Sequence, residues 1–92
     1  MVGIDKVASQ IITEQEGVIG PLAWEEAKKV PGMSVNIGNH EVKIEGNPKE
    51  VLEKLVAQYE RLFGAASREV CRDAVRPFLS QISQDEIPAV LK

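Results

Sequence analysis

Residues 18–27 read VIGPLAWEEA, which places a Gly-Pro pair inside a pattern that is otherwise helical. Residues 62–71 read LFGAASREVC and share this layout: two apolar residues, a glycine, small residues and a polar face with a glutamate. A glycine suits a tight bend, and Pro21 has no N–H to lose in the first turn of a helix. We therefore predict one helix–glycine–helix unit around Gly20 and another around Gly64.

The helices of both units are predicted from apolar residues spaced by three and four, the period of a helix with one buried face. In the first unit these are Ile4, Val7, Ala8, Ile11, Ile12, Val18 and Ile19. Asp5 is the expected N-cap there, and Asn47 is the expected cap of a helix that starts at Pro48. Pro77 should kink or split the last helix, because proline removes a helical hydrogen bond. Asp85 is the expected cap of a short final turn.

Between the two units, the alternation of residues 33–46, MSVNIGNHEVKIEG, changes to a period of two. A two-residue turn at Gly38-Asn39 would pair Val35 with Val42. One face then collects Met33, Val35, Ile37, His40, Val42 and Ile44, and the other collects Ser34, Asn36, Glu41 and Lys43. A slip of one residue would scramble this separation, so we predict a β-hairpin over residues 33–45.

The predicted fold class is mainly α (α+β), with two helix–glycine–helix units forming a four-helix core and a short β-hairpin between them. The 92 residues are expected to form a single domain. Its parts are a helical unit at 4–30, the hairpin at 33–45, a second helical unit at 48–83 and a C-terminal tail at 84–92. Shifting the first half by 44 positions places Gly20 on Gly64 without a gap. A true duplication and a chance agreement of helical periods both explain that match.

The charge and composition narrow the classes of partner. The net charge of −3 and the pI of about 5.1 argue against a general nucleic-acid binder, which needs excess Lys and Arg. No apolar run is long enough to cross a bilayer, and the first residues lack the apolar core of a signal peptide. Cys71 is the single cysteine, which fits a reducing compartment. We predict a cytoplasmic protein with no nucleic-acid and no membrane partner.

The sequence shows no motif typical of a catalytic, metal or cofactor site. Neither GxGxxG nor GxxxxGK[ST] occurs, and the single histidine, His40, has no other His or Cys near it in the sequence. The neighbouring acids Glu25 and Glu26 lie at a predicted helix start, where the helix dipole favours negative charge. We therefore predict no enzyme, no catalytic residues, no metal and no cofactor.

Cys71 lies on the apolar face of the last helix, between Val70 and Ala74. The first interpretation is a buried and inert thiol. A responsive thiol needs a lowered pKa and access to solvent, and the nearby Arg68 and Arg72 leave that alternative open. The alternative function is a small-ligand or thiol-based sensor that uses the helical core and Cys71.

Four residues are candidates for protein docking: Trp24, Arg68, Arg72 and Arg76. Trp24 falls off the apolar line of its helix, and tryptophan is enriched at interfaces. Packing of the indole against the hairpin of the same chain explains its position equally well. The arginines recur every four residues, which makes either a docking ridge for an acidic partner or a solvated face with local salt bridges.

The apolar face of the hairpin is the predicted dimer surface, with Val35, Ile37, Val42 and Ile44 as its residues. An isolated hairpin is marginally stable in water, so this face must be covered by helices or by another chain. Two-fold dimers are the commonest soluble oligomers, and we therefore predict a homodimer.

The four residues GPLA, from Gly20 to Ala23, resemble the Gly-Pro-Ile-Ala turn of small helical modules appended to bacterial signalling proteins. Those proteins include response regulators, kinases and phosphopeptide-recognition proteins. LFGAASREVC resembles a copy of this turn without the proline, and the hairpin is not part of the resemblance. The resemblance implies a regulatory or protein-interaction role with a protein partner in a regulatory pathway, and it transfers no catalytic residues. The leading prediction is a non-enzymatic, self-associating module of this kind.

Overall fold

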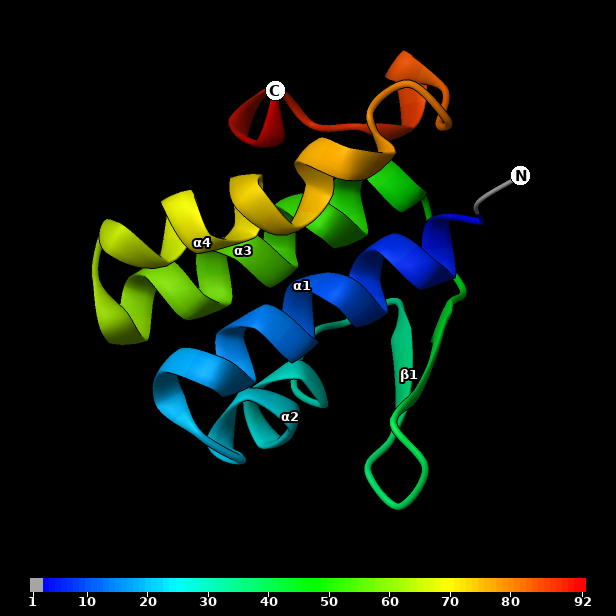
Figure 1. The fold of residues 1–92 in the computed structure, drawn as a ribbon. Helices are drawn as coiled ribbons and strands as arrows, with labels where there is room; N and C mark the ends of the chain where they lie inside the picture. The colour runs from blue at the N-terminus through cyan, green and yellow to red at the C-terminus, as the bar shows by residue number, and fades with distance from the viewer. Residues whose placement is uncertain (1–2) are drawn as a thin grey trace.

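In the computed structural model, which describes residues 3–92, the chain is mainly helical and carries one antiparallel two-stranded hairpin between helices (Figure 1). The elements in chain order are α1 (Ile4–Ile19), α2 (Leu22–Ala27), β1 (Met33–Asn36), β2 (Glu41–Ile44), α3 (Pro48–Phe63) and α4 (Ala66–Val75). Three short 3₁₀ turns follow: η1 (Arg76–Phe78), η2 (Gln84–Glu86) and η3 (Ala89–Leu91). Among these described residues, no helix combines the length and apolar character needed to span a membrane.

The start of α1 differs from the prediction. The helix begins at Ile4 with Gly3 in the N-cap position, so Asp5 is not the cap. The Asp5 carboxylate instead accepts a hydrogen bond of 2.8 Å from the backbone N–H of Ile44 on β2. A strand at a sheet edge leaves backbone donors unpaired, and a nearby carboxylate is a strong acceptor for one of them. Asp5 therefore ties the hairpin to α1.

The start of α3 agrees with the prediction. Asn47 caps the helix, and its side-chain oxygen accepts a hydrogen bond of 3.2 Å from the backbone N–H of Glu50. Pro48 occupies the first turn, where its missing N–H leaves no helical bond unmade. The buried face of α3 consists of Val51, Leu52, Leu55, Val56 and Tyr59.

Both predicted glycine bends are present, at the same end of the molecule in Figure 1. Gly20 has φ 79° and ψ −165°, and Gly64 has φ 90° and ψ 178°, a combination that only glycine adopts readily. Each glycine N–H donates to a carbonyl of the preceding helix turn at 2.9 Å. α2 and α4 each start two residues after their glycine, so a helix follows both bends as predicted, but Pro21 is the N-cap of α2 rather than part of its first turn.

The two halves do not form two clear copies of one unit. α2 has 6 residues and α4 has 10, although they follow equivalent bends. α4 also continues into η1, whereas α2 ends at Ala27 and leads through turns to the hairpin. The prediction of a mainly helical fold with an intervening hairpin is confirmed, but two repeated units are not evident from the elements.

The hairpin has the predicted register. The paired residues are Met33 with Ile44, Ser34 with Lys43, Val35 with Val42 and Asn36 with Glu41. The turn is longer than the predicted pair Gly38-Asn39, because the strands end one residue earlier on each side. The side chains of Asn36 and Asn39 accept hydrogen bonds from the backbone N–H groups of Gly38 and Glu41, both at 3.0 Å. These local bonds replace the outermost rung of the predicted ladder.

The last part of the chain differs most from the prediction. α4 stops at Val75 and passes into η1 around Pro77, which confirms the predicted split, so the helix does not run on towards residue 83. Residues 84–92 are not an external tail, because Ile87 and Leu91 are almost fully buried in the common core. Apolar side chains spaced by four in a short segment carry too weak a periodicity to predict this burial.

The predicted cap of the final turn is also wrong. The side chain of Ser83 accepts a hydrogen bond of 3.3 Å from the backbone N–H of Asp85, so Ser83 caps η2 and Asp85 lies inside it. Pro88 is the N-cap of η3 rather than part of its first turn. Serine and aspartate are comparable capping residues, and the choice depends on where the chain turns.

We expect a Gly64→Ala substitution to destabilise the fold by about 1–3 kcal/mol, because alanine is strained at this φ and ψ even though a Cβ would meet no atom within 4 Å. Gly17→Ala is the matched control. Gly17 lies within α1, where a Cβ also meets nothing within 4 Å, so alanine should stabilise the helix by about 0.5–1 kcal/mol. Urea denaturation of both variants measures the two changes. Equal stability of the Gly64 and Gly17 variants would contradict the role given to this bend.

Candidate functional site

Trp24 is not available for docking. Its side chain is 1% exposed, and its indole stacks on the imidazole of His40 with ring centroids 4.1 Å apart and an interplanar angle of 9°. His40 itself lies in the hairpin turn with φ 56°. Of the two interpretations of Trp24, packing against the hairpin of the same chain is the one that the structure shows.

The apolar face of the hairpin is largely covered by the chain itself. Val42 is buried, and Val35, Ile37 and Ile44 are partly buried against the core. The polar residues predicted for the other face are exposed. The predicted separation of the two faces is therefore confirmed, and the predicted dimer surface retains only part of its area for another chain.

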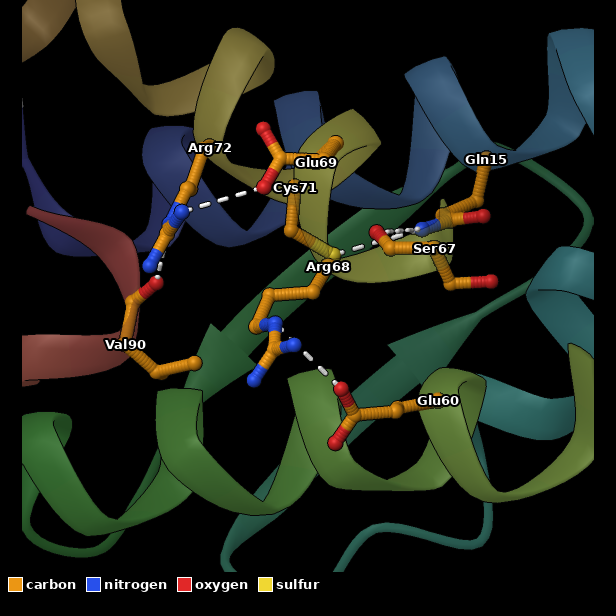
Figure 2. Close-up of polar contacts among 8 residues, drawn as sticks. All are labelled: Gln15, Glu60, Ser67, Arg68, Glu69, Cys71, Arg72 and Val90. Atoms are coloured by element: carbon orange, nitrogen blue, oxygen red, sulfur yellow. Dashed lines mark hydrogen bonds and ion pairs between the residues drawn. The ribbon is translucent and has the colours of Figure 1, made fainter. Parts of the chain in front are cut away.

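The three candidate arginines have partners within the chain. Arg68 and Arg72 lie on α4 and are drawn in Figure 2, and Arg76 is the first residue of η1. Arg68 pairs with Glu60 at 3.4 Å, Arg72 with Glu69 at 3.0 Å and Arg76 with Asp73 at 3.0 Å. The Nε atom of Arg72 also donates to the carbonyl of Val90 at 2.8 Å, which holds the C-terminal segment against α4. The salt-bridged face is thus the interpretation that the structure supports, rather than a free basic ridge.

Cys71 is a buried thiol, as the first interpretation predicts. The side-chain amide of Gln15 donates to Cys71 Sγ at 3.3 Å and to the carbonyl of Ser67 at 2.9 Å (Figure 2). Burial raises the pKa of the Cys71 thiol to about 11, which is the opposite of what a reactive thiol needs. The geometry therefore gives no support to a thiol-based sensor.

Gln15 is a buried polar residue that the sequence reading missed. It lies 0% exposed on α1 and joins this helix to α4. Its position, four residues after Ile11 and three after Ile12, places it on the buried face of the helix. That spacing could have identified Gln15 as buried, but the sequence does not show which residues its side chain bonds to.

The described residues hold no evident metal centre. Across residues 3–92, no three side chains among His, Cys, Asp and Glu gather closely enough to hold a metal ion.

The buried phenol of Tyr59 donates to the carbonyl of Ala23 at 2.6 Å, and burial raises its pKa above the usual range. Both Tyr59 and Cys71 therefore serve packing between helices and stay protonated at neutral pH.

The solvent-exposed side of α3 is the candidate interaction surface among the described residues. Ala57 lies at its centre, opposite the buried row of the helix, and is exposed. Glu53 and Glu60 lie four residues before and three after it, which places both on one side of Ala57. Lys54 and Arg61 lie three before and four after it, which places both on the other side. We refer to these five residues as the α3 face.

A surface hollow of about 300 Å³ lies on each side of Ala57. The acidic hollow is lined by Glu53, Val56, Ala57, Glu60, Ala89 and Val90. The basic hollow is lined by Val30, Pro31, Lys54, Ala57, Gln58 and Arg61. The walls opposite α3 thus come from η3 and from the loop before the hairpin, which are distant in the sequence.

Local bonds hold the walls of these hollows in place. The amide of Gln58 donates to a carboxylate oxygen of Glu26 at 2.8 Å, which joins α3 to α2 beside the basic hollow. The Arg72 bond to Val90 fixes the far wall of the acidic hollow. Hydrogen bonds therefore join α3 to α2 beside the basic hollow and η3 to α4 beside the acidic hollow.

A second exposed surface lies at the two bends. Among residues 3–92, the large apolar side chains that are most exposed are Val18 (66%), Leu22 (46%) and Leu62 (46%). Each is two residues from Gly20 or Gly64. Chain reversal at the bends leaves these side chains beyond the ends of the packed helices.

No family model, curated protein or solved structure matches this chain.

We expect the pH dependence of stability to report the burial of Cys71. Its pKa is 9.0 without burial and about 11 in the folded chain, so between these values the unfolded chain loses a proton that the folded chain keeps. The free energy of unfolding should therefore fall as the pH rises, with about 1 kcal/mol of the fall between about pH 8 and about pH 10 coming from Cys71. Denaturation of the unmodified chain and of Cys71→Ala isolates this contribution. An equal fall in both would show that the thiol is not buried.

Because Trp24 is the single tryptophan, its fluorescence reports the contact with the hairpin turn. We expect His40→Ala to shift the emission to longer wavelength, since removing the stacked ring admits water to the indole, and to cost about 1 kcal/mol of stability. His40→Phe retains an aromatic ring and is the control for the emission. An unchanged spectrum in His40→Ala would contradict the stacking.

Proposed function

We propose that this chain is a non-enzymatic protein-interaction module that self-associates through the α3 face. The observation that carries the proposal is the exposed Ala57 between two hollows of about 300 Å³, each with charged residues in its lining. A small residue at the centre of a helix surface lets a second helix approach closely, within the usual 8–10 Å between packed axes. The hollows on either side can accept the longer side chains of that helix.

Three features favour the α3 face over the residues first selected for docking. The indole of Trp24 is covered, the three candidate arginines already have partners, and the hairpin face packs partly on its own helices. The α3 face has its central residue in solvent and an open hollow on each side of it. Of these surfaces, the α3 face is therefore the one with open hollows for the side chains of a second chain.

A regulatory role rests on the resemblance of GPLA to the turn of signalling modules. The bend at Gly20 is entered from α1 and continued by α2, which is the order of elements on which that resemblance rests. We propose that the protein partner in a regulatory pathway is recruited by the associated form of the chain. The similar bend at Gly64 supports the further proposal that the two helix pairs are copies of one unit.

Sedimentation of the unmodified chain tests self-association. We expect the apparent mass to rise above 10.1 kDa with concentration, towards twice that value. A contact centred on one helix buries less area than a standard interface, so the dimer should be weak and dissociate in the micromolar range or above. A constant monomer mass up to about 1 mM, the weak end of measurable affinity, would overturn the proposed function.

A further inference from the structure

We propose that the α3 face binds the α3 face of a second copy in parallel orientation, around a two-fold axis that runs along the two helices. This inference rests on the proposed function and specifies its partner and geometry. It follows from the distribution of charge around Ala57, which is acidic on one side and basic on the other.

The orientation follows from symmetry. When two identical helices pack face to face in parallel around such an axis, the left side of one helix meets the right side of the other. Glu53 then lies beside Lys54 of the second copy at nearly the same height, since one residue of helix rises only about 1.5 Å. Glu60 likewise lies beside Arg61 of the second copy. Each of these contacts occurs twice in the dimer.

An antiparallel pair of the same helices has the opposite outcome. A two-fold axis across the helices brings like sides together, so Glu53 and Glu60 of one copy would meet Glu60 and Glu53 of the other. The basic residues would meet each other in the same way. Like charges in close contact are unfavourable, so the charge pattern selects the parallel arrangement against the antiparallel one.

The hollows can accept the charged side chains that the second copy places opposite them in the parallel arrangement. The lining of the acidic hollow combines apolar groups of Val56 and Ala89 with the carboxylates of Glu53 and Glu60. Long basic side chains can lay their methylene stems on such apolar groups while their charged ends reach carboxylates. Lys54 and Arg61 of the second copy are the side chains that meet this hollow. The basic hollow receives the glutamates of the second copy in return.

Part of this charge pattern is free for a partner. Glu60 shares its carboxylate with Arg68, and Arg61 donates to the side chain of Gln58 at 2.8 Å. Glu53 and Lys54 are exposed, and the ion pairs recorded among residues 3–92 do not include them. A reversal of charge at residues 53 and 54 therefore tests the interface without breaking a recorded contact within the chain.

Charge reversal and restoration are measured by sedimentation equilibrium. Glu53→Lys and Lys54→Glu should each weaken the dimer about tenfold, because each turns two attractive contacts into repulsive ones. The double variant Glu53→Lys/Lys54→Glu restores opposite charges across the parallel interface, and its dissociation constant should return to within about threefold of the original. Weakening of the original dimer by salt should accompany these changes.

Two surface variants control for net charge. Glu14→Lys on α1 matches the charge change of Glu53→Lys, and Lys43→Glu on the outer face of the hairpin matches that of Lys54→Glu. Neither should change the dissociation constant more than about twofold at moderate salt. Circular dichroism and urea denaturation establish that every variant is folded.

The outcomes separate the inference from the function on which it rests. A dimer that the single reversals at 53 and 54 leave unchanged would overturn the interface while self-association stands. Single variants that weaken the dimer with no recovery in the double variant would overturn the parallel orientation. A chain that stays monomeric at all concentrations would overturn both the interface and the proposed function.

Discussion

The two glycine bends are the constraint on which the arrangement of the other elements depends. At Gly20 and Gly64 the chain adopts positive φ with ψ near 180°, which no other residue adopts without strain. Each bend reverses the chain at the end of a long helix and lays a shorter helix back against it. α1 can then pack against α4, and the buried amide of Gln15 bridges the two helices. η3 packs against α4 and adds Leu91 to the common core.

Local patterns predicted the elements better than they predicted what the elements contact. The hairpin register, the Asn47 cap and the break at Pro77 each depend on a few adjacent residues, so they could be read from the sequence. The bond from Asp5 to Ile44 and the stack of Trp24 on His40 join segments that only the fold brings together. The same limit applies to Ile87, whose burial depends on where α4 stops.

In the candidate site, a single helix shows the difference between what local sequence predicts and what depends on the fold. The pattern of apolar residues in α3 predicted its buried side, and the charges around Ala57 were visible in the same stretch of sequence. A charged face is usually no more than a solvated surface, so the pattern alone did not distinguish it. The two hollows distinguish this face from an ordinary solvated surface. Their outer walls, at Val90 and Pro31, are formed by the tertiary structure. The site could therefore be recognised only after the fold was known.

The hairpin also bears on where a second chain can bind. Unpaired strand edges invite another strand, and short, charged or covered edges discourage it. Each strand here has four residues, and the Ile44 N–H at the edge of β2 is already bonded to Asp5. The inner face meanwhile contributes Val42 to the core and holds His40 against Trp24. Because its edge N–H is already bonded and its inner face packs on the core, the hairpin is better suited to covering the core than to pairing with another sheet. The exposed side of α3 makes no such contribution to the core, so a second chain can cover it without competing with the fold.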